Sequence, residues 1–464
     1  MKALIRNLKI VLLLFMVLSL ALLSGLVIQQ YRSRTRLFAA AGENKAALKT
    51  RYAAAGRIVD RNGAVLAVSQ DGERLYSSDA ATAKAVLHIV GDYTHNIANT
   101  VEARYQSELL GTDRNVLHQL LLDFTGHGFL GDDITLTIDG SLSKKAAQLL
   151  KNRSGAVVLM NYKTGALLAA VSSPGTTPQS VITYKGFPET SLFNRALSGA
   201  YAPGSTFKVI TAAAWLQSPD YDSQLTVNCQ GQSTVISHGA KESDGKHGPV
   251  NLETAFSKSC NVFFGQVGAS LGRGQLLAAA RNFGLGASLS LDRLEVLDSR
   301  IETLDDPSVL SWLAIGQPTA DSVLQMTPLQ MAMIAGAVAN AGLMVQPHVI
   351  DHLTDPLGIQ YGRPAAHPPR TVMNAATAAQ LEALMITATQ KGTGTKAAVK
   401  GRVVAGKTGT AQVEGKANTA LFIGYLVDET YPLAIAVVVE EGGSGGTVAA
   451  PVAAELFAAA CQAG

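Results

Sequence analysis

The sequence predicts an α+β protein in which helices pack on an antiparallel sheet, preceded by one membrane-spanning helix. Apolar strand–turn–strand segments occur at 56–67 and 155–173, and two more strands are expected near 419–427 and 432–440. The stretches between them are rich in alanine and typical of helices: 205–217, 252–269, 274–283, 327–341 and 376–389. Early strands, a helical middle and late strands together indicate one helix-covered sheet.

The composition of the 464 residues excludes several classes of protein. Hydrophobic residues make up 47% and charged residues 16%, and the charged share lies below the usual ~25%, so a disordered chain is excluded. The net charge of +3 is too small to indicate a nucleic-acid partner. Three cysteines without a C-x-x-C pair predict neither a disulfide scaffold nor a structural zinc site.

An uncharged apolar run covers residues 10–28. Its 19 residues can cross a hydrocarbon core of about 30 Å as a helix. A cleavable signal peptide usually has a shorter apolar core, of about 7–15 residues, followed by a cleavage site of small residues. This run is longer and has no clear cleavage site, so an uncleaved anchor is favoured over a cleaved signal peptide. Basic residues flank both sides, and the very short N-terminal tail is expected to stay in the cytoplasm.

The elements that follow are expected in this order. Residues 30–50 are polar and rich in alanine, as in a stalk, and 56–67 form a hairpin around an Asn62-Gly63 turn. A strand at 134–138 and a helix at 142–150 precede a change of composition near 155. The predicted divisions are a cytoplasmic tail at 1–9, a transmembrane signal anchor at 10–29, a stalk and small N-terminal pedestal domain at 30–150, and a main domain at 151–464.

The pattern S-x-x-K occurs three times, at Ser141/Lys144, Ser205/Lys208 and Ser243/Lys246. On a helix the two side chains share a face, so the amine can activate the hydroxyl as a nucleophile. Ser205 lies in YAPGSTFK, where Pro-Gly breaks the chain before an apolar stretch. This context predicts Ser205 at the start of a buried helix, where the helix dipole favours developing negative charge and a dry setting favours a neutral lysine.

The other two copies have surroundings that favour structural roles. Ser141 opens an exposed helix with a second lysine at 145 and is interpreted as a capping residue. Ser243 lies in the polar segment KESDGKHG, where a Ser–Lys pair would stay solvated.

A single S-x-N occurs, Ser259-Cys260-Asn261, 54 residues after Ser205. A serine can relay a proton, and an asparagine can both donate to and accept from a peptide group. An ordinary loop is the alternative interpretation. Cys260 is expected to be a buried small residue rather than a second nucleophile, and a disulfide with Cys229 is left open.

The segment Lys407-Thr408-Gly409-Thr410 follows an apolar run and is predicted on a strand. A cation there can hold a carboxylate, the two threonine hydroxyls can bind the same anion, and Gly409 lets a substrate approach the backbone. A second K-T-G begins at Lys163, in the turn of the 155–173 hairpin, and is interpreted as structural.

The ordered trio S-x-x-K, S-x-N and K-T-G resembles the motif set of penicillin-binding proteins. GRIVDRNGAVLA, LTIDGSLSKKA, GAVVLMNYKTGALLA and NRALSGAYAPGSTFK are similar to segments of the monofunctional class B members. The similarity spans about 56–450 and is weakest across 70–130. The short pedestal resembles the penicillin-binding protein A group. The resemblance implies the penicillin-binding/serine-β-lactamase-like transpeptidase fold.

The resemblance also implies roles for the residues that match the motifs. Ser205 would attack the carbonyl between two terminal D-alanines, and Lys208 would take its proton. Ser259, linked to the amines of Lys208 and Lys407, would pass a proton to the leaving D-alanine. Asn261 would orient the donor peptide.

The remaining implied roles concern substrate binding. Lys407 would supply positive potential, and Thr408 and Thr410 would bind the terminal carboxylate beside Gly409. The backbone N–H groups of Ser205 and Thr410 would form the oxyanion hole. No metal or organic cofactor is implied.

The resulting prediction is a serine D,D-transpeptidase that cross-links peptidoglycan stem peptides and is inhibited by β-lactams. The alternatives are a D,D-carboxypeptidase or β-lactamase on the same scaffold, and a non-catalytic β-lactam-binding sensor. The expected location is a single pass through the cell membrane with the catalytic domain on the extracytoplasmic face. A polytopic lipid II polymerase is the expected partner; division, elongation and sporulation roles stay open.

Overall fold

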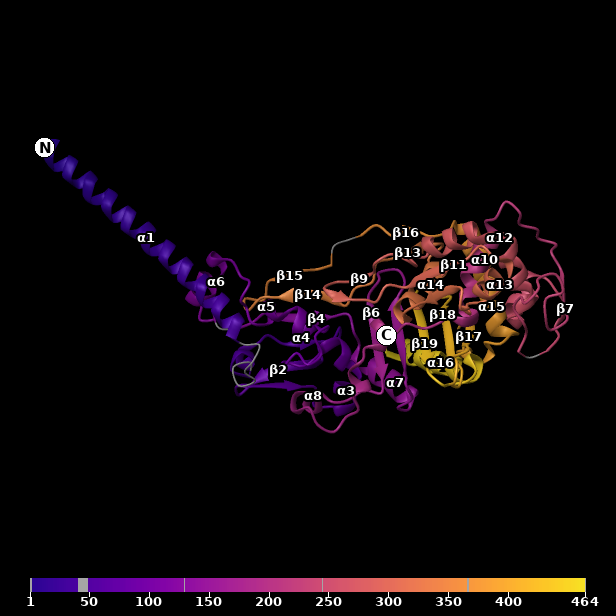
Figure 1. Ribbon diagram of the computed structural model, residues 1–464. Helices are drawn as coiled ribbons and strands as arrows, with labels where there is room; N and C mark the ends of the chain where they lie inside the picture. Colours follow the sequence, from indigo (N-terminus) through magenta and orange to yellow (C-terminus); the bar gives the residue numbers. More distant parts are fainter. Residues whose placement is uncertain (1, 41–48, 129, 244, 365–366, 464) are drawn as a thin grey trace.

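The computed structural model describes residues 2–40, 49–128, 130–243, 245–364 and 367–463. The long helix α1 (Lys2–Ala40) projects from an elongated body, and most of the C-terminal half of the chain lies toward the opposite end (Figure 1). Within α1, Ile5–Gly25 is long and apolar enough to span a membrane, and none of it is buried by the rest of the protein. The predicted span is therefore helical, while residues 41–48 of the predicted stalk lie outside the described residues.

The sheet of the C-terminal part has five antiparallel strands. They are β5 (Gly155–Asn161), β6 (Leu167–Ser173), β17 (Val404–Ala411), β18 (Thr419–Leu426) and β19 (Leu433–Val439), in the order β17-β18-β19-β5-β6. All four pairings are antiparallel, which confirms the predicted fold class. The order leaves β17, which carries the predicted Lys407 segment, at one edge of the sheet.

Helices cover both faces of this sheet. Side chains alternate along a strand, and in β19 Ala434, Ala436 and Val438 join the larger core while Ile435 and Val437 join a second core. The larger core includes α14 (Pro328–Ala339), and the second includes α7 (Gly140–Leu150) and α16 (Gly445–Ala463). The strands are thus buried on both sides, which explains their nearly continuous apolar sequences.

The larger core also holds the helices that carry the Ser205 and Ser259 motifs, together with two helices that pack against them. They are α10 (Lys208–Leu216), preceded by the short 3-10 helix η3 (Gly204–Phe207), α11 (Leu252–Lys258), α12 (Asn261–Asn282), α13 (Pro307–Ala314) and α15 (Ala375–Gln390). The prediction of one helix over 252–269 is wrong, because the chain breaks between α11 and α12. Ser259 caps α11 in the left-handed region, with φ of 61°, and at this break Ser259 and Asn261 are partly exposed while Cys260 is buried.

A second sheet lies nearer to α1 and draws on distant parts of the sequence. Its strands are β1 (Ile58–Val59), β2 (Val65–Gln70), β3 (Glu73–Tyr76), β4 (Asp133–Leu136), β14 (Ile350–Thr354) and β15 (Gln360–Tyr361), in the order β15-β14-β4-β1-β2-β3. The predicted 56–67 hairpin is the antiparallel pair β1–β2. Because β14 pairs with β4, residues from both sides of position 150 build this sheet.

The remaining elements are short or cover these two sheets. The helices are α3 (Ala80–Val90), α4 (Val101–Arg104), α5 (Gln106–Leu109), α6 (Val116–Phe124), α8 (Pro178–Thr183) and α9 (Arg195–Ser198). The strands are β7 (Val227–Cys229), β8 (Gly248–Val250), β9 (Ser290–Leu291), β10 (Leu294–Glu295), β11 (Arg300–Thr303), β12 (Ser322–Gln325), β13 (Leu343–Met344) and β16 (Arg370–Thr371).

Candidate active site

Ser205 lies in the turn that starts the η3–α10 helical segment. Its side chain is partly exposed, whereas Lys208, one turn later, is fully buried. Gly204 adopts a φ of 52°, and its N–H donates to Gly316 O at 3.0 Å. The N–H groups at a helix start have no intrahelical partners and carry partial positive charge. Ser205 therefore stands where the sequence predicted it, at a helix start inside the core.

The structure brings Lys208 together with the S-x-N motif, although 51 residues separate Lys208 from Ser259. Lys208 Nζ donates to Asn261 Oδ1 at 2.7 Å, to Ser259 O at 2.5 Å and to Ser259 Oγ at 3.2 Å. It also lies 5.5 Å from the ring centre of Phe264, within cation–π range. The left-handed conformation of Ser259 is what turns both its carbonyl and its hydroxyl toward this amine.

Lys407 approaches the same hydroxyl from β17. Its Nζ donates to Ser259 Oγ at 2.8 Å and to Thr408 O at 3.2 Å, and its side chain is fully buried. Burial, and secondly the charge of Lys208, holds the pKa of Lys407 well below its ordinary value. The Ser259 hydroxyl thus connects two amines, one of which is pushed toward its neutral form and is able to accept a proton.

Replacement of Lys208 by Met is expected to raise the pKa of Lys407, because the second cause of the lowering disappears. The pKa should stay below the ordinary lysine value, since burial is the larger cause. NMR titration of 13C-labelled lysine side chains, assigned with Lys407→Met, measures this shift. An unchanged Lys407 pKa in Lys208→Met would contradict electrostatic coupling between the two amines.

The free edge of β17 faces the Ser205 turn. Thr410 O accepts from Gln317 Nε2 at 3.3 Å, and Thr408 O accepts from Lys407 Nζ, so neither carbonyl points toward β18. In a strand the N–H and C=O of one residue point to the same edge. The Thr410 N–H therefore lies on the edge that faces the turn, as an oxyanion-hole donor must.

The hydroxyl groups of β17 are held by neighbours on other segments. Thr408 Oγ1 is 2.6 Å from Thr393 Oγ1, and Thr410 Oγ1 accepts from the N–H of Gly445, at the start of α16, at 3.4 Å. Two hydroxyls and a helix start around one strand provide donors suited to an anionic group.

Gly409 has a packing role in addition to the predicted access for substrate. A Cβ at this position would lie 2.9 Å from Thr206 Cγ2 and 3.0 Å from Pro203 O. The absence of a side chain therefore lets the turn that carries the nucleophile sit directly on β17. This close packing brings the predicted nucleophile and the predicted Lys407 segment together.

One cleft of about 690 Å³ connects these groups. Its lining includes all of the predicted site residues that reach the surface: Ser205, Ser259, Asn261, Thr408, Gly409 and Thr410. Lys208 and Lys407 lie fully buried behind them. Lys241 and Trp312 also line the cleft, and no sequence motif singled them out.

Gly316 and Gln317, in the segment that follows α13, support the site. A Cβ on Gly316 would lie 1.9 Å from Gly204 O. Gly316 adopts a φ of 80°, so its backbone conformation also favours glycine. Both features keep the residue before Ser205 in place.

Replacement of Gly316 by Ala is expected to slow acylation by a β-lactam on the order of 10²-fold, because the nucleophile turn must shift. Gly286→Ala is the matched control, since Gly286 has a φ of 81° but open space at its Cβ. Both variants carry the left-handed backbone cost of about 1–2 kcal/mol. Equal acylation rates in the two variants would show that the contact with Gly204 has no role; stopped-flow acylation kinetics make the comparison.

The duplicate motifs are structural, as predicted. Ser141 Oγ donates to Asp139 Oδ1 at 2.6 Å, and Lys144 pairs with Asp79. Lys163 begins the turn between β5 and β6, where Asn161 Oδ1 accepts from its N–H at 2.9 Å. Ser243 and Lys246 are both exposed in a loop, as predicted, and Ser243 also lines the cleft.

Cys260 is buried within the S-x-N motif. Burial, followed by its hydrogen bond to Glu242, raises the pKa of the thiol, so Cys260 is poorly suited to act as a nucleophile. Cys229 and Cys260 are both free thiols in this structure.

Three comparisons with known proteins agree with this geometry. Residues 155–458 match the family described as the penicillin binding protein transpeptidase domain. The chain is 31% identical to the peptidoglycan D,D-transpeptidase PbpA of Mycolicibacterium smegmatis, over 93% of this chain and 95% of that protein. Penicillin-binding protein A of M. tuberculosis in a ceftriaxone acyl-enzyme complex superposes with a TM-score of 0.80 at 28% identity, covering 89% of this chain and 100% of that one. The D,D-transpeptidase domain of a peptidoglycan glycosyltransferase from Eggerthella lenta gives a TM-score of 0.78, at 28% identity and 88% and 98% coverage.

Proposed function

Because the chain belongs to the penicillin-binding protein transpeptidase family, we propose that its activity depends on Ser205, Lys208, Ser259, Asn261 and Lys407. The protein is a class B penicillin-binding protein, a serine-type D,D-transpeptidase of peptidoglycan synthesis that β-lactams acylate. One observation carries the assignment of roles: a single hydroxyl, Ser259 Oγ, contacts the amines of Lys208 and Lys407 beside Ser205 in one cleft.

Acylation begins when Ser205 Oγ attacks the carbonyl carbon between the two terminal D-alanines of a stem peptide. The hydroxyl proton moves to the amine of Lys208, and the C–N bond breaks as an ester to Ser205 forms. The Ser259 hydroxyl, which contacts both lysine amines, relays a proton to the nitrogen of the departing D-alanine. Asn261, held by Lys208, orients the donor peptide through its amide.

Two groups stabilise the charges of this reaction. The N–H groups of Ser205 and Thr410 form the oxyanion hole, in which one donor is typically worth about 2.7–4 kcal/mol of barrier. Lys407, whose pKa is lowered, acts through its contact with Ser259 Oγ and not as a fixed positive charge, while Thr408 and Thr410 bind the terminal carboxylate and Gly409 leaves the strand accessible. The free edge of β17 supports this arrangement, because both carbonyls that bracket Gly409 bond to side chains and point away from β18.

Transfer completes the cycle when the amine of a neighbouring stem peptide attacks the ester carbonyl. The amine loses a proton to the Lys208 amine, the ester C–O bond breaks, and Ser205 regains its hydrogen. The product is a cross-link between two glycan strands. A β-lactam follows the first half of this path and remains attached to Ser205.

The partition of the acyl-enzyme between transfer to an amine and hydrolysis tests the proposed reaction. The purified chain is incubated with a D-alanyl thioester and increasing concentrations of a D-amino acid, and the ratio of transfer product to hydrolysis product is measured. We expect transfer to dominate and to increase with amine concentration. Hydrolysis that is insensitive to the amine would instead indicate a carboxypeptidase.

The N-terminal helix fits a single-pass membrane protein. We propose that residues 1–9 are cytoplasmic, that 10–29 anchor the chain, and that the catalytic domain at 151–464 lies on the extracytoplasmic face. Residues 30–150 form a stalk and pedestal, to which strands β14 and β15 contribute. A polytopic lipid II polymerase that contacts the anchor and pedestal would deliver nascent strands to the cleft.

A further inference from the structure

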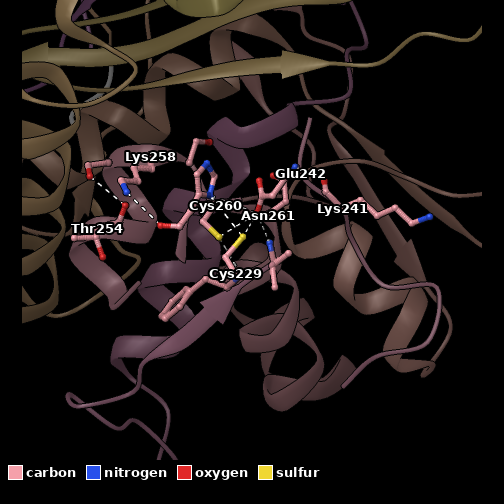
Figure 2. Close-up of polar contacts among 12 residues, drawn as sticks. Cys229, Lys241, Glu242, Thr254, Lys258, Cys260 and Asn261 are labelled. Carbon is pink, nitrogen blue, oxygen red and sulfur yellow. Dashed lines mark hydrogen bonds and ion pairs between the residues drawn. The ribbon is translucent and has the colours of Figure 1, made fainter. Parts of the chain in front are cut away.

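Two cysteines, a histidine and a glutamate meet beside the S-x-N motif. The side chains are Cys229, Glu242, His247 and Cys260, whose nearest ligand-type atoms all lie within 4.8 Å of one another. Figure 2 shows the sulfur atoms of Cys229 and Cys260 turned toward the same point, beside Glu242. We propose that these four side chains bind one zinc ion.

The fold brings the four residues from separate elements. Cys229 ends β7, and His247 directly precedes β8, which pairs with β7. Glu242 lies in the loop between these strands, and Cys260 caps the start of α12. The sequence spacings, with 12, 4 and 12 residues between ligands, do not form a C-x-x-C pattern, so neither the composition nor a sequence motif predicts a metal there.

The distances fit a tetrahedral ion. With Zn–S bonds of about 2.3 Å and Zn–N or Zn–O bonds of about 2.0 Å, neighbouring ligand atoms should lie about 3.3–3.8 Å apart. Glu242 Oε1 lies 3.0 Å from Cys260 Sγ, 3.4 Å from Cys229 Sγ and 3.7 Å from His247 Nδ1. Cys229 Sγ lies 3.8 Å from His247 Nδ1. Small side-chain movements suffice to centre an ion among them.

Burial makes this cluster costly without a cation. Both cysteines are fully buried, and the side chain of Glu242 is only 2% exposed. Among the described residues, no lysine or arginine forms an ion pair with Glu242, and thiols are weak hydrogen-bond donors. A buried carboxylate with such partners is unfavourable, whereas a divalent ion compensates it and both thiolates.

The start of α12 offsets the remaining negative charge. The N–H of Val262 donates to Glu242 Oε1 at 2.9 Å, and the N–H of Phe263 donates to Cys260 Sγ at 3.4 Å. N–H groups at a helix start favour anionic ligands, including thiolates. The donor set of two sulfurs, one nitrogen and one oxygen suits zinc, and four protein ligands leave no position for substrate, so the ion is structural.

The ion would fasten the 229–247 loop to the active-site segment. Asn261 follows the ligand Cys260, and its Nδ2 donates at 2.7 Å to the carbonyl of Lys241, which precedes the ligand Glu242. Loss of the ion should therefore displace Asn261 from Lys208. This consequence for acylation rests on the proposed function, whereas the binding of zinc does not.

Metal content of the purified full chain tests the proposal. We expect about one zinc per chain by mass spectrometry, and at least a tenfold lower content in Cys229→Ser and His247→Ala. Cys461→Ser is the matched control, since Cys461 lies outside the cluster, and it should keep its zinc. Ser205→Ala should also keep its zinc while losing acylation, which separates failure of the metal site from failure of the proposed function.

A second measurement tests metal binding by the unaltered chain, so it does not depend on whether the variants fold. The unaltered chain is stripped with a chelator and titrated with cobalt(II), and one equivalent should give the thiolate-to-cobalt charge-transfer band of a tetrahedral site, which zinc then abolishes. Melting temperature should rise when zinc is returned. A folded chain that takes up neither metal at micromolar concentration, or that contains a Cys229–Cys260 disulfide after purification without reductant, overturns the proposal.

Discussion

Replacement of Ser205 by Ala is expected to abolish covalent labelling by a fluorescent penicillin, a loss on the order of 10³-fold or more. No other described hydroxyl combines a helix start, the cleft and a buried lysine one turn away. Stability should change by less than about 0.5 kcal/mol, because the side chain is partly exposed. Gel fluorescence and peptide mass spectrometry measure the label, and thermal melting measures the stability.

Ser141→Ala is the matched control for this prediction. Ser141 has the same S-x-x-K spacing, but its hydroxyl donates to Asp139 and its lysine pairs with Asp79. Labelling should therefore stay at the level of the unaltered chain. A label that persists in Ser205→Ala, or that maps to Ser243 in the cleft, would contradict the assignment of the nucleophile.

Replacement of Lys407 by Met is expected to lower the acylation rate by about 10²–10³-fold while raising the melting temperature. The rate falls because Ser259 loses one of its two amine partners, and proton transfer of this kind contributes about 10²–10⁴-fold. The hydrogen bond itself is worth about 1 kcal/mol. The lowered pKa of Lys407 shows that burial disfavours its charged amine, and a methionine side chain carries no such cost.

The direction of the pH effect follows from the lowered pKa of Lys407. The unfolded chain binds this proton more strongly than the folded chain. At pH values below the ordinary lysine pKa, Lys407 therefore lowers the free energy of unfolding. The penalty grows as pH falls, until the pKa of the folded state is reached. The stabilisation of Lys407→Met should therefore be larger at neutral pH than near pH 10, as thermal melting across pH will measure.

Lys163→Met is the matched control, because it removes the lysine of the other K-T-G. Lys163 is exposed in the turn between β5 and β6. Neither acylation nor the pH dependence of melting should change. A Lys407→Met chain that melts below the unaltered chain at neutral pH would show that the hydrogen bonds of Lys407 outweigh its burial.

Much of the fold followed from local pattern. The 155–173 hairpin, the late strands and the helices at 327–341 and 376–389 were predicted because each is a long apolar stretch bounded by turn residues. The break at Ser259 was missed because residues on both sides of it form helices well. The entry of β14 into the N-terminal sheet was missed for a different reason, since a strand does not specify its partner locally.

The sequence by itself determined which residue types carry the chemistry, because Ser205, Lys208, Ser259 and Lys407 stand in short patterns whose neighbours distinguish them from duplicate motifs. Only the tertiary structure decided which amines meet which hydroxyl, that Gly316 supports the nucleophile turn, and that Cys229 and Cys260 share one pocket with Glu242. The reason is physical: these contacts join different segments, from 13 residues apart for Cys229 and Glu242 to 148 for Ser259 and Lys407, and the packing of whole elements sets their distances. Chain-local patterns carry no information about that packing.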